Sequence, residues 1–230
     1  MPRGNGIVKK DALFGFIVVA LIGVSAYASF FVAPDEKTMH AVQRIFYLHA
    51  PCGMAALVAF LIAFVGNVAY LVKRESKWDW LGIASVEVGL AFCTVVLLTG
   101  PIWAHPAWGV WWAWDARLTS TLVLWLLYVV YLLLRTMMED PDRRALVSAF
   151  YGVFAFLDVP LVYGSIWWWR TQHPQPVVFT SGGLNPVMRK VFYLSWVSLT
   201  CLMVLLIRKR YELEALRSEV RGLEREAEAQ

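Results

Sequence analysis

Four histidines are the residues of this chain best suited to holding a metal, and each lies near the end of a long apolar run. His49 follows RIFYL at the start of one run, and His173 follows WWWRTQ after another. His105 lies between these two runs, and His40 precedes His49. A lone histidine near a membrane surface usually serves as a polar anchor. Two neutral imidazoles from separate elements can instead ligate one iron from opposite sides.

A tryptophan-rich segment, residues 99–121, contains five of the chain's 12 tryptophans. They are Trp103, Trp108, Trp111, Trp112 and Trp114. Anchoring a helix at a bilayer surface needs only one or two aromatic residues per helix end, so this cluster indicates a further role. The indole is a large flat apolar ring with one N–H donor. A cluster of such rings suits a flat apolar ligand with a polar edge, and haem has that shape.

These two features together predict a haem site in which His49 and His173 ligate the iron. Asp115 and Arg117 directly follow the tryptophans. Arg117 is expected to meet a haem propionate, and Arg44 can do the same, because guanidinium binds carboxylate well. Asp115 would then orient Arg117 or accept an indole N–H. A weak interfacial salt bridge between Asp115 and Arg117 explains this pair equally well.

Other chemistries fit the sequence less well. Zinc needs three or four clustered histidine, cysteine or carboxylate ligands, and copper transport favours methionine or cysteine series. The three cysteines, Cys52, Cys93 and Cys201, form no CxxC motif and read as small buried apolar residues. The sequence has no GxxxxGK[ST], GxSxG or HExxH motif. We therefore expect a binding protein that catalyses no reaction on its own.

The composition indicates an integral membrane protein. Hydrophobic residues make up 59% of the 230, charged residues only 17%, and the mean hydropathy is +0.57. The formal charge of +4 does not indicate a nucleic-acid partner, because the basic residues lie in short loops between apolar runs. The lipid bilayer is the partner that this pattern predicts.

Six apolar runs predict an all-α protein with six transmembrane helices. Gly100 and Pro101 are expected to end the third, and the loop after the fifth, with Pro174, Pro176 and Gly182, to be non-helical. The predicted spans are 13–32, 45–72, 80–98, 118–134, 145–169 and 187–207.

Charge asymmetry predicts that both termini are cytoplasmic. With that orientation, 15 of the 21 lysines and arginines fall in inner segments and six in outer ones. The tryptophan-rich segment then faces outward. We divide the chain into a six-helix membrane domain, 1–210, and a charged cytoplasmic helical tail, 211–230. The tail carries a thin apolar stripe, Leu213, Leu216, Val220 and Leu223. We expect it to be a solvated helix.

Two acids, Glu87 and Asp158, fall inside predicted spans, and such acids are often functional. They are the basis of an alternative function, a permease subunit that moves haem or another substrate across the membrane. Packing against polar neighbours such as Asn67 or Ser165 explains them equally well. A purely structural membrane subunit is a third reading.

The motif WGVWWAWDARLTS, preceded by GPIW, resembles the tryptophan-rich "WWD" signature of a superfamily of haem-handling proteins. Six spans, the short length, RIFYLHAP and the WWW…H element resemble the CcmC family most closely. The resemblance covers about 13–207. His105 and the charged tail depart from the family pattern.

This resemblance implies a role in bacterial System I cytochrome c maturation. Family members hold haem at the outer face of the inner membrane, between the WWD segment and two external histidines, here His49 and His173. The haem is implied to be haem b, bound non-covalently and facing the periplasm. It is presented to the haem chaperone CcmE, and the family works with the transporter subunits CcmA and CcmB and with the small protein CcmD.

Overall fold

The computed structural model describes residues 5–36, 39–173, 178 and 183–228 of the chain. The described residues form helices and no β-sheet; Pro174, Pro176 and Gly182 of the predicted loop lie outside them. Six stretches are long and apolar enough to cross a membrane, which confirms the predicted all-α, six-span membrane protein. The long helices are α1 (Asn5–Tyr27), α2 (Phe46–Lys73), α3 (Ser76–Trp108), α4 (Ala116–Thr136), α5 (Pro141–Phe156), α6 (Asp158–Trp168) and α7 (Pro186–Glu228). Two short helical turns, η1 (Ala28–Val32) and η2 (Ala41–Ile45), follow α1 and precede α2.

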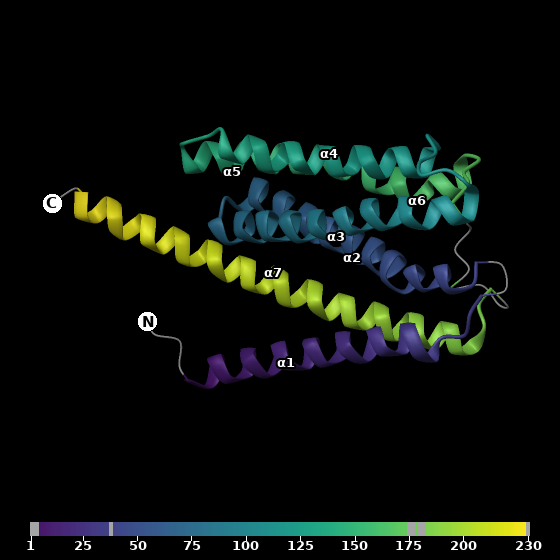
Figure 1. The fold of residues 1–230 in the computed structure, drawn as a ribbon. Coiled ribbons are helices and arrows are strands. Elements are labelled where there is room, and N and C mark those ends of the chain that lie inside the picture. Colours follow the sequence, from purple (N-terminus) through teal and green to yellow (C-terminus); the bar gives the residue numbers. More distant parts are fainter. Residues whose placement is uncertain (1–4, 37–38, 174–177, 179–182, 229–230) are drawn as a thin grey trace.

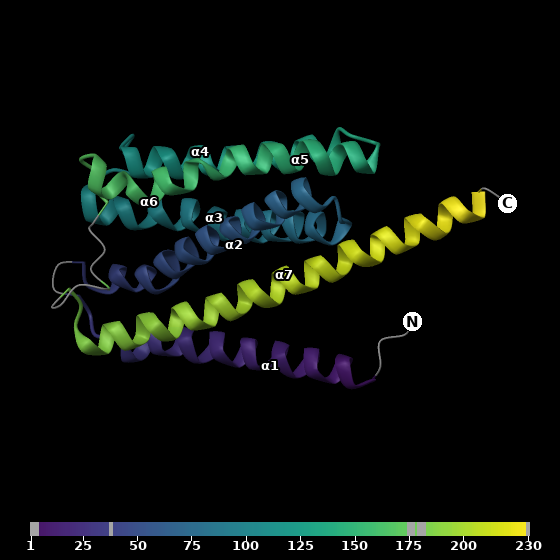
Figure 2. The same cartoon turned by 180° about the vertical axis from the view of Figure 1, so that it is seen from behind.

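The helices form a bundle with α2 and α3 at its centre (Figure 1). α4, α5 and α6 lie on one side of this pair, and α7 followed by α1 lies on the other (Figures 1 and 2). The start of α1 and the end of α7 lie at one end of the bundle, which we call the terminal end. The end of α3 and the start of α4 lie at the opposite end, which we call the tryptophan end.

Small residues allow α2 and α3 to approach closely. Ala59 and Ala63 of α2 are completely buried, and a Cβ atom on Gly89 of α3 would lie 3.3 Å from the Cβ of Ala59. A Cβ atom on Gly66 would lie only 3.0 Å from the backbone nitrogen of Gly82 in α3. Lipid tails are as apolar as the side chains, so the hydrophobic effect does not drive helices together in a membrane. Helices associate instead through close van der Waals packing, which small residues allow. The α2–α3 pair is therefore the tightest junction around which the bundle is built.

The prediction that Gly100 and Pro101 end the third helix was wrong. α3 continues through Pro101 and Pro106 to Trp108, eight residues beyond Gly100. Membrane helices tolerate proline, because neighbouring helices and side chains compensate for the lost backbone bond. The helix ends at Gly109, which has a left-handed φ of 76° and donates its N–H to the carbonyl of His105 at 2.8 Å. The first ten residues of the tryptophan-rich segment are thus helical.

The fifth predicted span is a broken helix rather than a continuous one. α5 ends at Phe156, and α6 begins two residues later at Asp158. Pro160 has no N–H to offer the carbonyl four residues earlier, and its ring crowds that carbonyl. Leu157 instead donates its N–H to the carbonyl of Phe154 at 3.1 Å, which tightens the turn at the break.

α7 is a single helix that extends past the last predicted span into the tail. It is tied to α1 by a 2.9 Å hydrogen bond between the hydroxyls of Ser25 and Ser195 and by an ion pair between Lys209 and Asp11. The four apolar residues of the tail stripe are between 41% and 61% exposed. These four residues are Leu213, Leu216, Val220 and Leu223.

We predict that Gly152→Ala destabilises the bundle by about 1–3 kcal/mol, as overpacking of a tight interior does. A Cβ at Gly152 would lie 2.1 Å from Nδ2 of Asn67, which is buried and also confined by Gly82. Thermal unfolding in detergent measures the loss. Gly23→Ala in α1 is the matched control, because nothing lies within 4 Å of its added Cβ, and it should not lower the melting temperature. Equal effects of both substitutions would contradict the packing argument.

Candidate functional site

His49 lies in the first turn of α2 at the tryptophan end, and its side chain points at α3. The residue is only 9% exposed, and its Nδ1 lies 2.9 Å from Oγ1 of Thr99. Gly100 leaves space beside the ring, since a Cβ there would make an ordinary 3.5 Å contact with Cε1. The small-residue junction between α2 and α3 thus places this imidazole against the start of the tryptophan-rich segment.

Trp103 lies beside the His49 ring, and Phe46 and Met39 in turn contact Trp103. Trp103 meets the His49 ring edge-on with ring centroids 5.7 Å apart, and Phe46 lies 6.2 Å from Trp103. The indole N–H of Trp103 donates to the sulfur of Met39 at 3.1 Å. Trp103 is thus held on one side of the His49 ring by Phe46 and Met39.

His173 comes to this region from the segment that follows α6. Its backbone N–H donates to Oγ1 of Thr171 at 3.1 Å, and that hydroxyl donates to Oδ2 of Asp115 at 2.6 Å. His173 and Arg117 both lie near the His49 ring. The structure thus brings together the two histidines that the sequence singled out, although they are 124 residues apart in the chain.

Asp115 connects α4 to the segment that carries His173. It caps α4 by accepting the N–H of Leu118 at 2.9 Å, and it accepts two further bonds, from the Thr171 hydroxyl and from the Gln172 N–H at 2.9 Å. Burial opposes the charged form of the carboxyl, but these three donors outweigh it and hold the pKa of Asp115 below its usual value. Asp115 is thus an ionised anchor for residues 171–173.

Arg117 does not form the predicted ion pair with Asp115 within the described residues. Its guanidinium reaches from the first turn of α4 to α6, where it donates to the carbonyl of Val162. The charge of Asp115 nevertheless acts on it from nearby. Arg117 is a partly buried cation near His49.

The tryptophans of the segment are divided between buried and exposed positions. Trp103 is partly buried beside His49, and Trp108 is the last residue of α3. Trp111 and Trp114 are 60% and 78% exposed. Trp112 packs edge-on against Trp114 at 5.7 Å, and its buried indole N–H has no acceptor among the described residues. An aromatic surface with one unsatisfied donor therefore lies at this end.

Three further tryptophans at the end of α6 are also exposed. Trp167, Trp168 and Trp169 are 51–60% exposed. They precede His173 by only a few residues.

Other candidate residues are engaged elsewhere. Arg44, in η2, forms a 3.0 Å ion pair with Asp35. The exposed ring of His105 stacks on Trp111 with centroids 4.3 Å apart. His40 is exposed and has an unusual positive φ of 48°. Within the described residues, no three histidine, cysteine or acidic side chains gather as a metal cluster.

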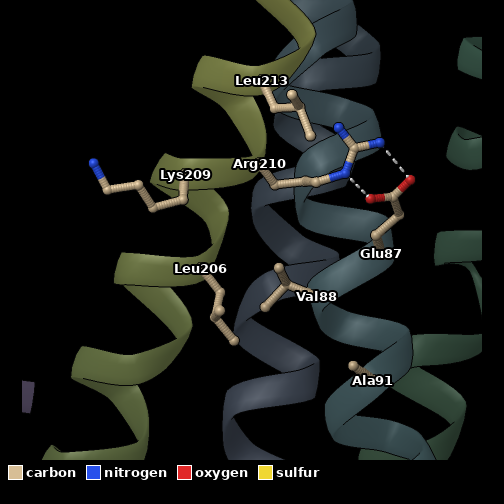
Figure 3. A pocket seen from close by; sticks show the side chains of 7 residues that line it. All are labelled: Glu87, Val88, Ala91, Leu206, Lys209, Arg210 and Leu213. Carbon is tan, nitrogen blue, oxygen red and sulfur yellow. Dashed lines mark hydrogen bonds and ion pairs between the residues drawn. The ribbon is translucent and has the colours of Figure 1, made fainter. Parts of the chain in front are cut away.

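Glu87 lies apart from the histidines, in the part of α3 nearer the terminal end. Arg210 of α7 donates to both of its carboxylate oxygens, and the Nη2–Oε1 distance is 2.7 Å (Figure 3). The pair lies beside a groove of about 300 Å³ between α3 and α7, which Val88 and Leu206 help to line. Glu87 thus joins two helices.

Asn67 and Ser165, the polar neighbours suggested for the two intramembrane acids, make hydrogen bonds to other groups. Asn67 accepts a long, 3.4 Å hydrogen bond from Tyr131, and the hydroxyl of Ser165 donates to the carbonyl of Val162. The carboxylate of Asp158 is buried at the start of α6, and its Oδ2 has no hydrogen-bond partner among the described residues.

Sequence reasoning missed the residues that position the histidines. Thr99, Thr171 and Met39 carry no motif of their own. Their spacing from the candidate residues was the available signal. Thr99 precedes Trp103 by four residues, which is one helical turn, and Thr171 precedes His173 by two.

Comparison with known proteins gives a consistent result. A family model described as "CcmC: Heme exporter protein C" matches residues 8–228. A "Heme exporter protein C" of Bradyrhizobium diazoefficiens is 31% identical over 90% of this chain and 79% of its own length. Those of Paracoccus denitrificans and Escherichia coli K12 are 32% and 30% identical, over 81% and 74% of this chain and 80% and 69% of their own lengths. Because the family model covers nearly all of the sequence, this chain belongs to the CcmC family, heme exporter protein C.

Proposed function

We propose that this protein binds haem b non-covalently at the outer face of the bacterial inner membrane and delivers it to the periplasmic haem chaperone CcmE during cytochrome c maturation. His49 and His173 ligate the iron from its two sides. The protein works with the transporter subunits CcmA and CcmB and with CcmD, and it catalyses no reaction on its own. The names of its relatives, "Heme exporter protein C", support the choice of haem as cargo.

The observation that carries this proposal is the joint position of the two histidines. His49 on α2 and His173 in the segment after α6 lie near one another at the tryptophan end, although 124 residues separate them. Two imidazoles from separate elements can bind one iron from opposite faces.

The surroundings of the histidines fit a porphyrin. The exposed faces of Trp111 and Trp114 offer apolar cover for a flat ring. Arg117, a partly buried cation, is the nearest candidate to balance propionate charge. Arg44 can serve in the same way only by sharing its charge with Asp35.

The proposed orientation rests on the distribution of charge. The arginines of the tail and of the α2–α3 and α4–α5 turns lie at the terminal end, opposite the histidines. Because basic residues favour the cytoplasmic side, both termini are assigned to the cytoplasm and the haem site to the periplasm. The division into a membrane domain, 1–210, and a cytoplasmic tail belongs to the same proposal.

Removal of either ligand should weaken haem binding. We expect His49→Ala and His173→Ala each to lower haem retention at least about tenfold. Loss of a residue that only hydrogen-bonds to a metal ligand already weakens binding by that factor, and loss of the ligand itself should cost more. The absorbance of copurified haem measures retention, and the wild type should show a low-spin, six-coordinate spectrum. His40→Ala is the control and should keep its haem. Unchanged haem in the double variant would rule the proposal out.

The alternative of a permease subunit makes a different prediction for Glu87. Because Glu87 is engaged with Arg210, we expect Glu87→Gln to cost about 1 kcal/mol or less of stability and to leave haem retention and CcmE loading unchanged. Thermal unfolding measures stability, copurified haem measures retention, and haem attached to CcmE measures loading. Loss of haem delivery in Glu87→Gln and Asp158→Asn, with the histidine variants active, would favour the permease instead.

Asp115 should give the site an acid-sensitive component. Its pKa is lower in the folded protein than in the unfolded one, so its stabilising effect is complete above pH 3.8 and is lost as the pH falls further. We expect the melting temperature of the wild type to fall over this range more steeply than that of Asp115→Asn. At neutral pH, Asp115→Asn should lower haem retention about tenfold, because residues 171–173 lose their ionised anchor. Parallel pH profiles for the two proteins would contradict this role.

A further inference from the structure

The hydrogen bond between His49 and Thr99 fixes more than the position of the ring. Nδ1 of His49 lies 2.9 Å from Oγ1 of Thr99, so one of the two atoms must supply the proton. A neutral imidazole has one N–H, on either Nδ1 or Nε2, and the other nitrogen carries a lone pair. The direction of this one bond therefore decides which nitrogen of His49 can bind a metal.

The hydroxyl of Thr99 already has a use for its single proton. Oγ1 lies 2.7 Å from the carbonyl oxygen of Val95, one turn earlier in α3, in the geometry of a donated hydrogen bond. If this proton goes to Val95 and Nδ1–H donates to Thr99, both contacts are hydrogen bonds. If the proton goes to Nδ1, the 2.7 Å contact becomes two oxygens facing one another without a proton. The first arrangement satisfies more groups and is therefore favoured.

The same helix contains a second threonine in which this arrangement is unambiguous. Thr94 donates its hydroxyl to the carbonyl of Leu90 at 2.8 Å and lies 2.8 Å from Nε1 of Trp125. An indole nitrogen can only donate, so Thr94 must accept from Trp125 and give its own proton to the carbonyl. Thr99 has the same two contacts, with His49 in the place of Trp125.

We propose that Thr99 is a positioning residue that holds His49 in the Nδ1–H tautomer and leaves Nε2 as the atom that ligates the haem iron. This inference rests on the proposed function, because it assigns an atom to the iron. It also makes a statement about the haem-free protein that can be tested alone. Hydrogen bonds of this kind fix the tautomer and the orientation of metal-binding histidines.

The register of α3 supports the same role. Thr99 and Trp103 are four residues apart and so lie on one face of the helix. Thr99 fixes one edge of the His49 ring, while Trp103 meets the ring edge-on at 5.7 Å. The ring is thus held at two points by one rigid element.

The tautomer can be measured directly in the haem-free, full-length protein. Nitrogen-15 NMR of histidine-labelled protein in bilayers at about pH 8, where an ordinary histidine is neutral, distinguishes the two ring nitrogens. The His49 signal is identified by its loss in His49→Gln. We expect Nδ1 to be protonated in the wild type and the preference to be lost in Thr99→Val, which keeps the shape but removes the acceptor. A His49 protonated on Nε2 in the wild type overturns the proposal, even if His49→Ala loses haem.

The haem-loaded protein gives a second readout. We expect Thr99→Val to lower haem retention about 10- to 100-fold and to raise the reduction potential of the haem, because an imidazole without its N–H acceptor is a weaker electron donor. Thr99→Ser should restore both values. Thr94→Val is the matched control, since it removes an equivalent hydroxyl in α3 that contacts Trp125, and it should change neither. An unchanged potential and tautomer in Thr99→Val would overturn the proposal. If the wild type has the Nδ1–H tautomer but His49→Ala retains its haem, the result counts against the proposed function instead.

Discussion

The close contact between α2 and α3 determines where the chemistry of this protein can lie. Alanines and glycines bring the two backbones together, so the side chains at the end of the contact have few positions available. His49 and Thr99 occupy that end, one on each helix. Larger residues along the contact would separate the helices and break this hydrogen bond without touching either residue.

The six spans could be predicted from the sequence because the bilayer sets a simple requirement on length and hydrophobicity. A helix that crosses the bilayer needs about 20 apolar residues, and such runs are visible without any knowledge of packing. The boundaries failed where tertiary neighbours decide. Pro101 did not end α3, since surrounding helices support that segment, whereas Pro160 in the fifth span accompanies a break. The residue that ends α3 is Gly109, which adopts a backbone conformation that few other residues accept.

Sequence reasoning singled out the two histidines of the candidate site but not the residues that support them. His49 and His173 stood out because both were placed at the same depth beside the tryptophans, and the fold brings them together. Thr99 and Thr171 did not stand out, because a threonine near a helix end usually bonds only its own backbone. The partner of Glu87 was likewise invisible, since Arg210 lies 123 residues away, just after the last predicted span.

The unbroken course of α7 links the two faces of the membrane mechanically. At 1.5 Å per residue, its 43 residues span about 65 Å, which exceeds the thickness of a bilayer including its headgroups. One end follows shortly after the segment that carries His173, and the other end projects from the opposite side of the bundle. A rod of this length acts as a lever: a tilt of a few degrees at its charged end moves the far end by several ångströms. A protein that binds the tail can therefore move the start of α7, at Pro186, from the opposite end of the bundle.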